Sequence, residues 1–224
     1  MRDYVEFFRQ FRERFQTTGA VAPSSRFLAG ALTGPMRRRE RPARILEVGP
    51  GTGPVTRRIV RALGPEDTLD LVEINRRFAA ILKHRFRTRK DHREKADRVR
   101  IHCCPLQEFE SEAPYDYIIS GLPLNNFPPD LVRTIFDSFF RLLAPEGTLS
   151  YFEYMYVRPI RRRLSNGDER TRIVELDEML NDYLARHRFR RSWVFANFPP
   201  AWVQHLRSEP TGAHSNATNS EPPT

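Results

Sequence analysis

Apolar residues in the middle of the chain recur with two periods, which predict strands and helices in alternation. Short apolar runs predict strands, because a strand buried on both faces carries few polar positions. Longer stretches with apolar residues three and four apart predict amphipathic helices. The predicted strands cover 44–48, 68–74, 98–103, 115–120 and 148–154, with a last strand within 190–206, and the predicted helices cover 56–63, 77–86, 128–143 and 169–188. Strands that alternate with helices form parallel sheets, so we expect an α/β doubly wound fold.

The two ends of the chain differ from this pattern. Residues 3–16 place aromatic side chains three and four positions apart, which predicts a helix with one aromatic face formed by Tyr4, Phe7, Phe8, Phe11 and Phe15. Arginines at other positions make this a basic amphipathic helix that either lies in a lipid interface or packs on the domain as a lid. A short helix is expected around Phe27 and Leu32. We therefore predict N-terminal amphipathic helices over 1–39, the main domain over 40–206 and a disordered, Pro-rich tail over 207–224.

The chain is strongly basic. Its 224 residues include 37 Lys and Arg against 28 Asp and Glu, which gives a formal net charge of +9. Such a charge favours contact with nucleic acid or with an anionic membrane surface. The sequence shows neither an apolar run long enough to span a bilayer nor a cleavable leader, so we expect any membrane contact at the surface. The two cysteines, Cys103 and Cys104, are adjacent, which excludes a disulfide framework and indicates a reducing, cytoplasmic compartment.

A glycine-rich turn follows the first predicted strand. In the sequence "ILEVGPGTGPVT", Gly49, Gly51 and Gly53 lie between a strand and a helix. Open α/β sheets bind their ligands at this edge, and glycines let the backbone approach a nucleotide closely. Glu73 ends the next strand about twenty residues later, where a carboxylate can accept hydrogen bonds from a ribose diol. The turn and the acid together predict an adenosine-containing ligand.

Two features distinguish between a dinucleotide and S-adenosylmethionine. The dinucleotide fingerprint needs a further glycine three residues after the second, and here Pro54, Val55 and Thr56 follow Gly53. Glu47 lies two residues before the first glycine, and the string "EVGPGTG" resembles the cofactor signature of class I S-adenosylmethionine-dependent methyltransferases. That resemblance implies a Rossmann-like, mostly parallel seven-stranded sheet with helices on both faces. It also implies that Glu47 orients the methionine end of the cofactor, and that Glu73, Ile74, Leu106, Gln107 and Ser120 contact it.

The stretch "SGLPLNNFP", residues 120–128, ends the fourth predicted strand. Proline removes a backbone donor and restricts the residue before it, so the strand has to break here and leave polar groups free. The stretch resembles the "NLPY" and "PPY" elements of methyltransferases that act on amino nitrogen. By that resemblance Ser120, Gly121 and Leu122 form the acceptor side of the site. Enzymes that methylate adenine in nucleic acid carry an aromatic residue after the proline to stack the base, whereas this chain has Leu124.

Three stretches together resemble the bacterial phospholipid N-methyltransferase family: "TGAVAPSS", "ILEVGPGTGPVT" and "SGLPLNNFP". The resemblance implies a peripheral enzyme on the inner face of the cytoplasmic membrane that methylates the primary amine head group of phosphatidylethanolamine or ornithine lipid. It implies that the N-terminal helix, with Phe7, Phe8, Phe11 and Phe15, binds the membrane. Beside it we expect Tyr151 near the acceptor, and Arg161 and Arg162 on a lipid phosphate or carboxylate.

Two other functions remain open from the sequence. An rRNA adenine dimethyltransferase would suit the net charge and the "GLP" motif, although Leu124 and the lack of a C-terminal RNA-binding domain speak against it. A basic binding module that keeps a nucleotide fold without activity is the second. His102, His187 and His205 are isolated in the sequence and no Cys/His spacing resembles a metal site, so we expect transfer without a metal.

Overall fold

The structure is a computed structural model of the 224-residue chain, and it describes residues 26–155, 167–197 and 199–210. Three of the sequence predictions fall outside these residues. They are the amphipathic helix over 3–16 with Phe7, Phe8, Phe11 and Phe15, the basic pair Arg161 and Arg162, and the tail beyond residue 210. These three remain predictions.

Seven strands form one sheet in the order β3-β2-β1-β4-β5-β7-β6. Neighbours from β3 to β5 run parallel, and β7 runs antiparallel to both β5 and β6. The chain first builds outward from β1 to β3 and then returns to place β4 on the other side of β1, so the topological switch point lies between β1 and β4. The strands are β1 (Arg44–Val48), β2 (Thr68–Val72), β3 (Val99–His102), β4 (Tyr115–Ser120), β5 (Leu143–Tyr154), β6 (Arg188–Val194) and β7 (Ala201–Arg207).

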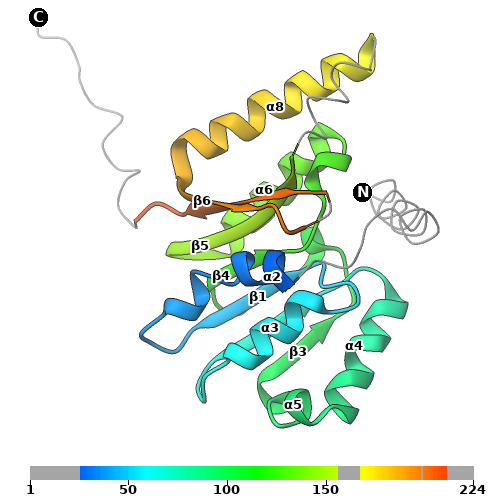
Figure 1. Cartoon of the computed structure of the whole chain (residues 1–224), viewed down its shortest axis with the longest axis vertical. Coiled ribbons are helices and arrows are strands. Elements are labelled where there is room, and N and C mark those ends of the chain that lie inside the picture. Colours follow the sequence, from blue (N-terminus) through cyan, green and yellow to red (C-terminus); the bar gives the residue numbers. More distant parts are fainter. Residues whose placement is uncertain (1–25, 156–166, 198, 211–224) are drawn as a thin grey trace, which may run out of the picture.

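Helices cover both faces of this sheet (Figure 1). One buried cluster joins the sheet to α2 (Arg26–Leu32), α3 (Pro54–Ala62) and α4 (Arg76–Thr88), and the other joins it to α6 (Pro129–Leu142) and α8 (Asp168–His187). Short helical segments connect the elements: η1 (Met36–Arg38), α5 (Lys90–Arg93), η2 (Ala96–Arg98), η3 (Leu106–Glu108) and η4 (Leu124–Asn126). The expected mostly parallel, seven-stranded α/β fold is confirmed.

The central strands alternate between the two cores. On β1, Ile45 joins the α2–α3–α4 cluster and Leu46 joins the α6–α8 cluster, and both are fully buried. A strand that buries both faces reads as a continuous apolar run, which is why β1, β2 and β4 were predicted within two residues. Glu47 is the exception on β1, because it is a fully buried acid among apolar neighbours.

Two regions differ from the sequence prediction. Residues 190–206 were predicted to hold one strand, but they lie in two antiparallel strands, β6 and β7, whose pairing runs from Arg188 opposite Leu206 to Val194 opposite Ala201. The outer strand β6 is mostly exposed, and its arginines hide the apolar alternation on which the prediction depends. The charged connection over 87–98, for which no helix was predicted, contains α5 and η2. Leu28, Leu32 and Met36 are buried in the core, so the chain from α2 onward packs with the sheet.

Candidate active site

The glycine-rich turn leaves β1 at the switch point and starts α3. Gly49, Gly51 and Gly53 all have positive φ, at 67°, 59° and 79°, which L side chains rarely adopt. Gly49 N–H donates to the carbonyl of Val72 at 2.9 Å, so the turn begins while still paired to β2. Pro54 occupies the first turn of α3, where its missing N–H costs nothing. The turn is therefore a tight backbone cradle at the carboxyl ends of β1 and β2.

Glu73, just past the end of β2, closes this cradle from the side. Its Oε2 accepts from Gly51 N–H at 2.8 Å and its Oε1 accepts from Asn75 N–H at 2.9 Å. Asn75 in turn caps α4, because its side-chain oxygen accepts from the N–H groups of Arg77 and Phe78. Each carboxylate oxygen has a second lone-pair position, so Glu73 retains acceptor capacity for hydroxyl groups.

Glu47 lies beneath the cradle on the α3 side of the sheet. It is completely buried, and neither carboxylate oxygen reaches hydrogen-bond geometry with any described residue. Burial raises the pKa of this carboxyl from 4.5 to about 8, and the nearby Thr56 hydroxyl and backbone offset the effect only in part. Because Thr56 offsets the burial of this acid only in part, Glu47 can accept a further cationic or hydrogen-bonding group.

A narrow cleft runs from the glycine turn along the ends of β2 and β3. Six of the residues predicted for the site line it together: Gly49, Glu73, Ile74, Leu106, Gln107 and Leu122. The side-chain nitrogen of Gln107 is buried and has no hydrogen-bond partner among the described residues, so a donor is available inside the cleft. Sequence reasoning missed four lining residues, Val48, Val72, Cys104 and Pro105. Val72 and Pro105 are apolar and lie outside any motif, Val48 lies inside the "EVGPGTG" signature but was not singled out, and Cys104 was considered only for its adjacency to Cys103.

The "SGLP" stretch rests directly on the glycine turn. Gly121 N–H donates to the carbonyl of Val48 at 2.8 Å, and a Cβ placed on Gly121 would lie 2.7 Å from the carbonyl oxygen of Gly49. No side chain fits at that separation, so Gly121 is a close-contact glycine. Ser120 is fully buried, and its Oγ accepts from Leu122 N–H at 3.2 Å. The structure thus brings Ser120, Gly121 and Leu122 to the cofactor cradle, as their predicted place next to it requires.

The remainder of this stretch is fixed by burial. Leu124 and Phe127 are buried in the α6–α8 core, and the Asn125 side-chain amide donates to the carbonyl of Tyr154 at 3.4 Å. Leu124 N–H donates to the carbonyl of Leu122 at 3.0 Å across Pro123, whose φ of −81° and ψ of 72° form an inverse γ-turn. Leu124 therefore points into the protein, and this position does not offer a surface to a base.

Tyr151 lies in the core of β5. Ile119 on β4 pairs with Ser150 on β5, so Tyr151 follows alongside Ser120. Its ring packs edge-on against Phe136, and its hydroxyl donates to Glu153 Oε1 at 3.2 Å, with both side chains buried. Tyr151 is therefore beside the strand that carries the predicted acceptor groups, although its ring is enclosed by the core.

Neither a metal site nor a membrane-spanning helix is found in the part of the chain that the structure describes. No group of three or more His, Cys, Asp or Glu side chains there is arranged to hold a metal ion. No helix within the same residues combines the length and the apolar character that crossing a membrane requires.

The fold and the site define a class. Residues 46–149 match the family model described as a methyltransferase domain. Similar solved structures include the O-methyltransferase TomG from Streptomyces achromogenes in complex with S-adenosylmethionine, at 18% identity over 84% of this chain and 82% of that chain, with a TM-score of 0.61. The N-methyltransferase NodS from Bradyrhizobium japonicum, in complex with S-adenosylhomocysteine, is 18% identical over 82% of this chain and 88% of that chain, with a TM-score of 0.54. The protein is a class I methyltransferase, and its cofactor is S-adenosylmethionine.

A curated relative narrows the class. The chain is 30% identical to the ornithine lipid N-methyltransferase of Singulisphaera acidiphila over 165 residues. The matched region covers 72% of this chain and 85% of the relative. The chain therefore belongs to the same methyltransferase family as this ornithine lipid N-methyltransferase.

The residues present fit this cofactor. The glycine cradle accommodates a closely approaching ligand, Glu73 can accept from a ribose diol, and Gln107 offers a buried donor. Glu47, once ionised, would supply a counter-charge for a ligand that carries a sulfonium and an ammonium group. When bound, S-adenosylmethionine supplies an activated methyl group at the cradle.

Proposed function

We propose that this protein transfers methyl groups to the amine head group of a membrane lipid, at the inner face of the cytoplasmic membrane. Ornithine lipid and phosphatidylethanolamine are the substrate candidates, because both present a primary amine beside acyl chains. The enzyme would act as a peripheral protein that reaches its substrate from the surface of the bilayer.

The observation that carries this proposal is the contact between the "SGLP" stretch and the glycine turn. Gly121 leaves no room for a side chain against Gly49, so the acceptor stretch and the cofactor cradle share a surface. Leu122 lines the cofactor cleft and, two residues later, the chain turns back into the core. An amine held by this stretch would therefore lie beside the methionine end of the cofactor.

Amine methylation needs a free lone pair, and this stretch provides hydrogen-bond acceptors to hold the amine hydrogens. Ser120 supplies a side-chain oxygen, and the backbone from Gly121 to Pro123 supplies carbonyl groups. In-line placement of the nucleophile lowers the barrier by supplying orientation in advance, so a strong base is not required. We assign Ser120, Gly121 and Leu122 to the acceptor side, with Tyr151 supporting them from β5.

Membrane contact is the second part of the proposal. The net charge of +9 suits an anionic surface, and the aromatic, arginine-bearing sequence over 3–16 suits a lipid interface. Phe7, Phe8, Phe11 and Phe15 would insert, while Arg161 and Arg162 would grip an acidic lipid group. The similarity to an ornithine lipid enzyme supports a lipid acceptor. Nothing observed favours the rRNA alternative.

A direct transfer assay tests this function. Purified protein and labelled S-adenosylmethionine are incubated with vesicles that contain ornithine lipid or phosphatidylethanolamine, and with structured rRNA in parallel. We expect label in an amine lipid and none in RNA. The variant Glu73→Ala, which removes the acid that ties the cradle, should abolish transfer and serves as the background control. Label in RNA alone would contradict the proposal.

A further inference from the structure

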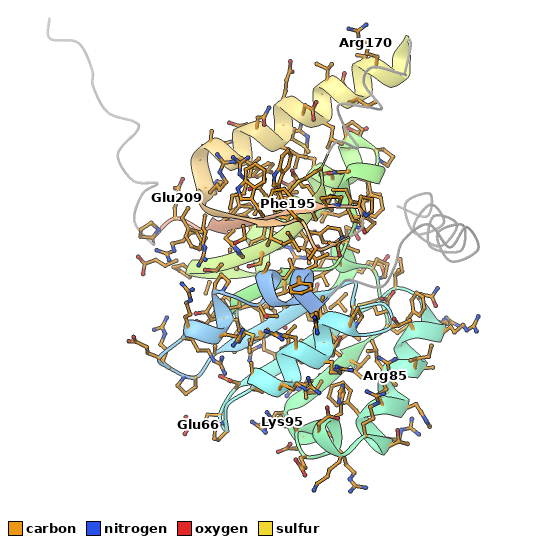
Figure 2. All side chains as sticks on the ribbon, viewed as in Figure 1. Glu66, Arg85, Lys95, Arg170, Phe195 and Glu209 are labelled. Atoms are coloured by element: carbon orange, nitrogen blue, oxygen red, sulfur yellow. The ribbon has the colours of Figure 1, made fainter. Side chains whose placement is uncertain are left out.

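The two most exposed large aromatic residues in the described part of the chain lie at one end of β6. Trp193 is 54% exposed and Phe195 is 68% exposed. Their rings stack with centroids 5.7 Å apart, and Trp202, opposite Trp193 on β7, meets the Trp193 ring edge-on at 5.7 Å. Figure 2 labels Phe195 in the segment that joins β6 to β7. Large exposed aromatic groups that adjoin one another favour a surface that contacts a protein, a membrane or a ligand.

An arginine belongs to the same cluster. The guanidinium of Arg191 lies 5.3 Å from the centroid of Trp193 and 5.5 Å from that of Trp202, which is cation–π geometry. Arg188 is also exposed on β6, whereas Arg190 lines a cavity beside α2 with Gly30 and Arg37, on the other face of the sheet; β6 carries no acidic residue. The acid nearest in register, Glu153 opposite Trp202, is buried. The exposed face is therefore aromatic and positively charged.

This cluster lies at the edge of the sheet that carries the active site. β6 is antiparallel to β7, and β7 is antiparallel to β5, so β6 runs in the same direction as β4 and β5. Trp193 is the next-to-last residue of β6 and thus lies at its carboxyl end, as Ser120 lies at the carboxyl end of β4. The order β4-β5-β7-β6 separates the two ends by three strand spacings, which is about 14 Å.

We propose that Trp193, Phe195, Trp202 and Arg191 form a membrane-docking surface, whose partner is the interface of an anionic bilayer. Tryptophan and phenylalanine rings settle at the level of lipid head groups, and arginine pairs with their phosphates. Docking here brings the "SGLP" stretch to the plane of the head groups. The inference rests on the proposed lipid substrate, and it adds a second membrane contact to the one predicted for residues 3–16.

The geometry favours a bilayer over a protein partner. The three rings and the guanidinium form one contiguous cluster that is both aromatic and cationic, which matches the mixed apolar and anionic chemistry of a lipid head-group interface. β6 is the last strand of the sheet, so pairing with a second copy of this chain is the competing occupant. The positive charge of Arg188, Arg190 and Arg191 argues against two such edges meeting.

The full-length protein reports on this surface without a label. The chain has two tryptophans, and both lie in the proposed surface. Vesicles of phosphatidylcholine with phosphatidylglycerol should shift the tryptophan emission to shorter wavelength, and lipids brominated on the acyl chain near the head group should quench it. Vesicles of phosphatidylcholine alone should give a much smaller change, because the charge complementarity is lost.

Variants on β6 separate the contribution of the docking surface to vesicle binding from that of residues 3–16. Replacing Trp193 and Phe195 together by Ala should weaken vesicle partitioning by at least about tenfold, because two half-exposed rings no longer bury apolar area. Phe189→Ala is the matched control, since Phe189 is 45% exposed on the same strand but lies at its opposite end. We expect its partitioning to change less than about twofold. Circular dichroism and thermal unfolding verify that both variants fold.

The outcomes distinguish this inference from the proposed function. Vesicle binding with unshifted, unquenched tryptophan emission would overturn the docking surface, even if a lipid is methylated. Shifted and quenched emission without transfer to any lipid would support docking and refute the proposed function. A mass of two chains by light scattering, with emission that depends on protein concentration and not on lipid, would identify a second copy as the occupant and overturn the inference.

Discussion

The state of Glu47 controls how cofactor binding depends on pH. Without a ligand, burial raises the pKa of its carboxyl to about 8, so at neutral pH most molecules carry the neutral acid. A bound sulfonium and ammonium favour the ionised form, which lowers that pKa. Binding then releases a proton at pH values between the lowered pKa of the bound state and about 8. As pH rises through this range, the dissociation constant of S-adenosylmethionine should fall by about tenfold per pH unit, since one pKa unit is worth about 1.4 kcal/mol.

Isothermal titration calorimetry measures this directly. Titrating S-adenosylmethionine in buffers of different ionisation enthalpy gives the number of protons released, which we expect to approach one at pH values about one or two units below 8. The variant Glu47→Gln keeps the shape of the side chain and cannot ionise. It should bind more weakly, release no proton from this site, and lose the steep pH dependence, apart from the part that comes from the cofactor amine.

The free energy of unfolding provides an independent check, because it should decrease as pH rises whereas the affinity for the cofactor should increase. Glu47 binds a proton in the folded state at pH values between 4.5 and about 8, whereas the unfolded chain has lost it, so the free energy of unfolding should decrease as pH rises through this window. Glu47→Gln removes this slope, and the variant should gain stability relative to the wild type at higher pH. Equal proton release and equal pH slopes in the two proteins would refute the role assigned to Glu47.

Three shorter predictions follow from other contacts. Gly121→Ala places a methyl group 2.7 Å from the Gly49 carbonyl and should weaken cofactor binding at least tenfold (about 1.4 kcal/mol), whereas Gly30→Ala, with only ordinary contacts in α2, should not, as calorimetry can show. Asp67→Ala leaves the buried guanidinium of Arg39 without its partner and should lower the free energy of unfolding by about 3 kcal/mol in urea. Arg39 and two N–H groups outweigh burial and lower the pKa of Asp67 from 3.8, so this contribution is fully present above 3.8 and is lost as pH falls below 3.8 through the lowered pKa of the folded state. Cys104 lines the cofactor cleft while Cys103 is exposed, so saturating S-adenosylmethionine should slow alkylation of Cys104 alone, measured by mass spectrometry.

The part of the site that could be predicted from sequence is the part that local chemistry dictates. Gly49, Gly51 and Gly53 occupy left-handed backbone that requires glycine, so their spacing between a strand and a helix was a sufficient signal. Glu47 was found from its place in the "EVGPGTG" signature, and Glu73 from its distance of about twenty residues from the glycine turn. The parallel strands were found because burial on both faces leaves uninterrupted apolar runs.

Other features depend on contacts that the sequence does not contain. Gly121 has no local reason to be glycine, and its reason is the carbonyl of Gly49, seventy-two residues away in the chain. From the sequence, Leu124 was considered only as the residue that replaces a base-stacking aromatic side chain. In the structure it is buried in the core with Leu122 and Phe127. The spacing of those three apolar residues was the signal for burial. The β6–β7 hairpin was missed because exposed arginines on β6 interrupt the alternation.

The placement of these features on one sheet edge has a consequence for turnover. The cofactor cleft extends from β1 toward β2 and β3, whereas the aromatic surface lies at β6, on the other side of β4 and its "SGLP" stretch. A bilayer that contacts β6 and the acceptor stretch therefore leaves the β2–β3 side facing water. The cofactor can exchange while the enzyme stays docked, so its dissociation constant should be equal within about twofold with and without anionic vesicles. A large shift in that constant on adding vesicles would mean that the membrane covers the cleft, and the docking direction argued from β6 would be wrong.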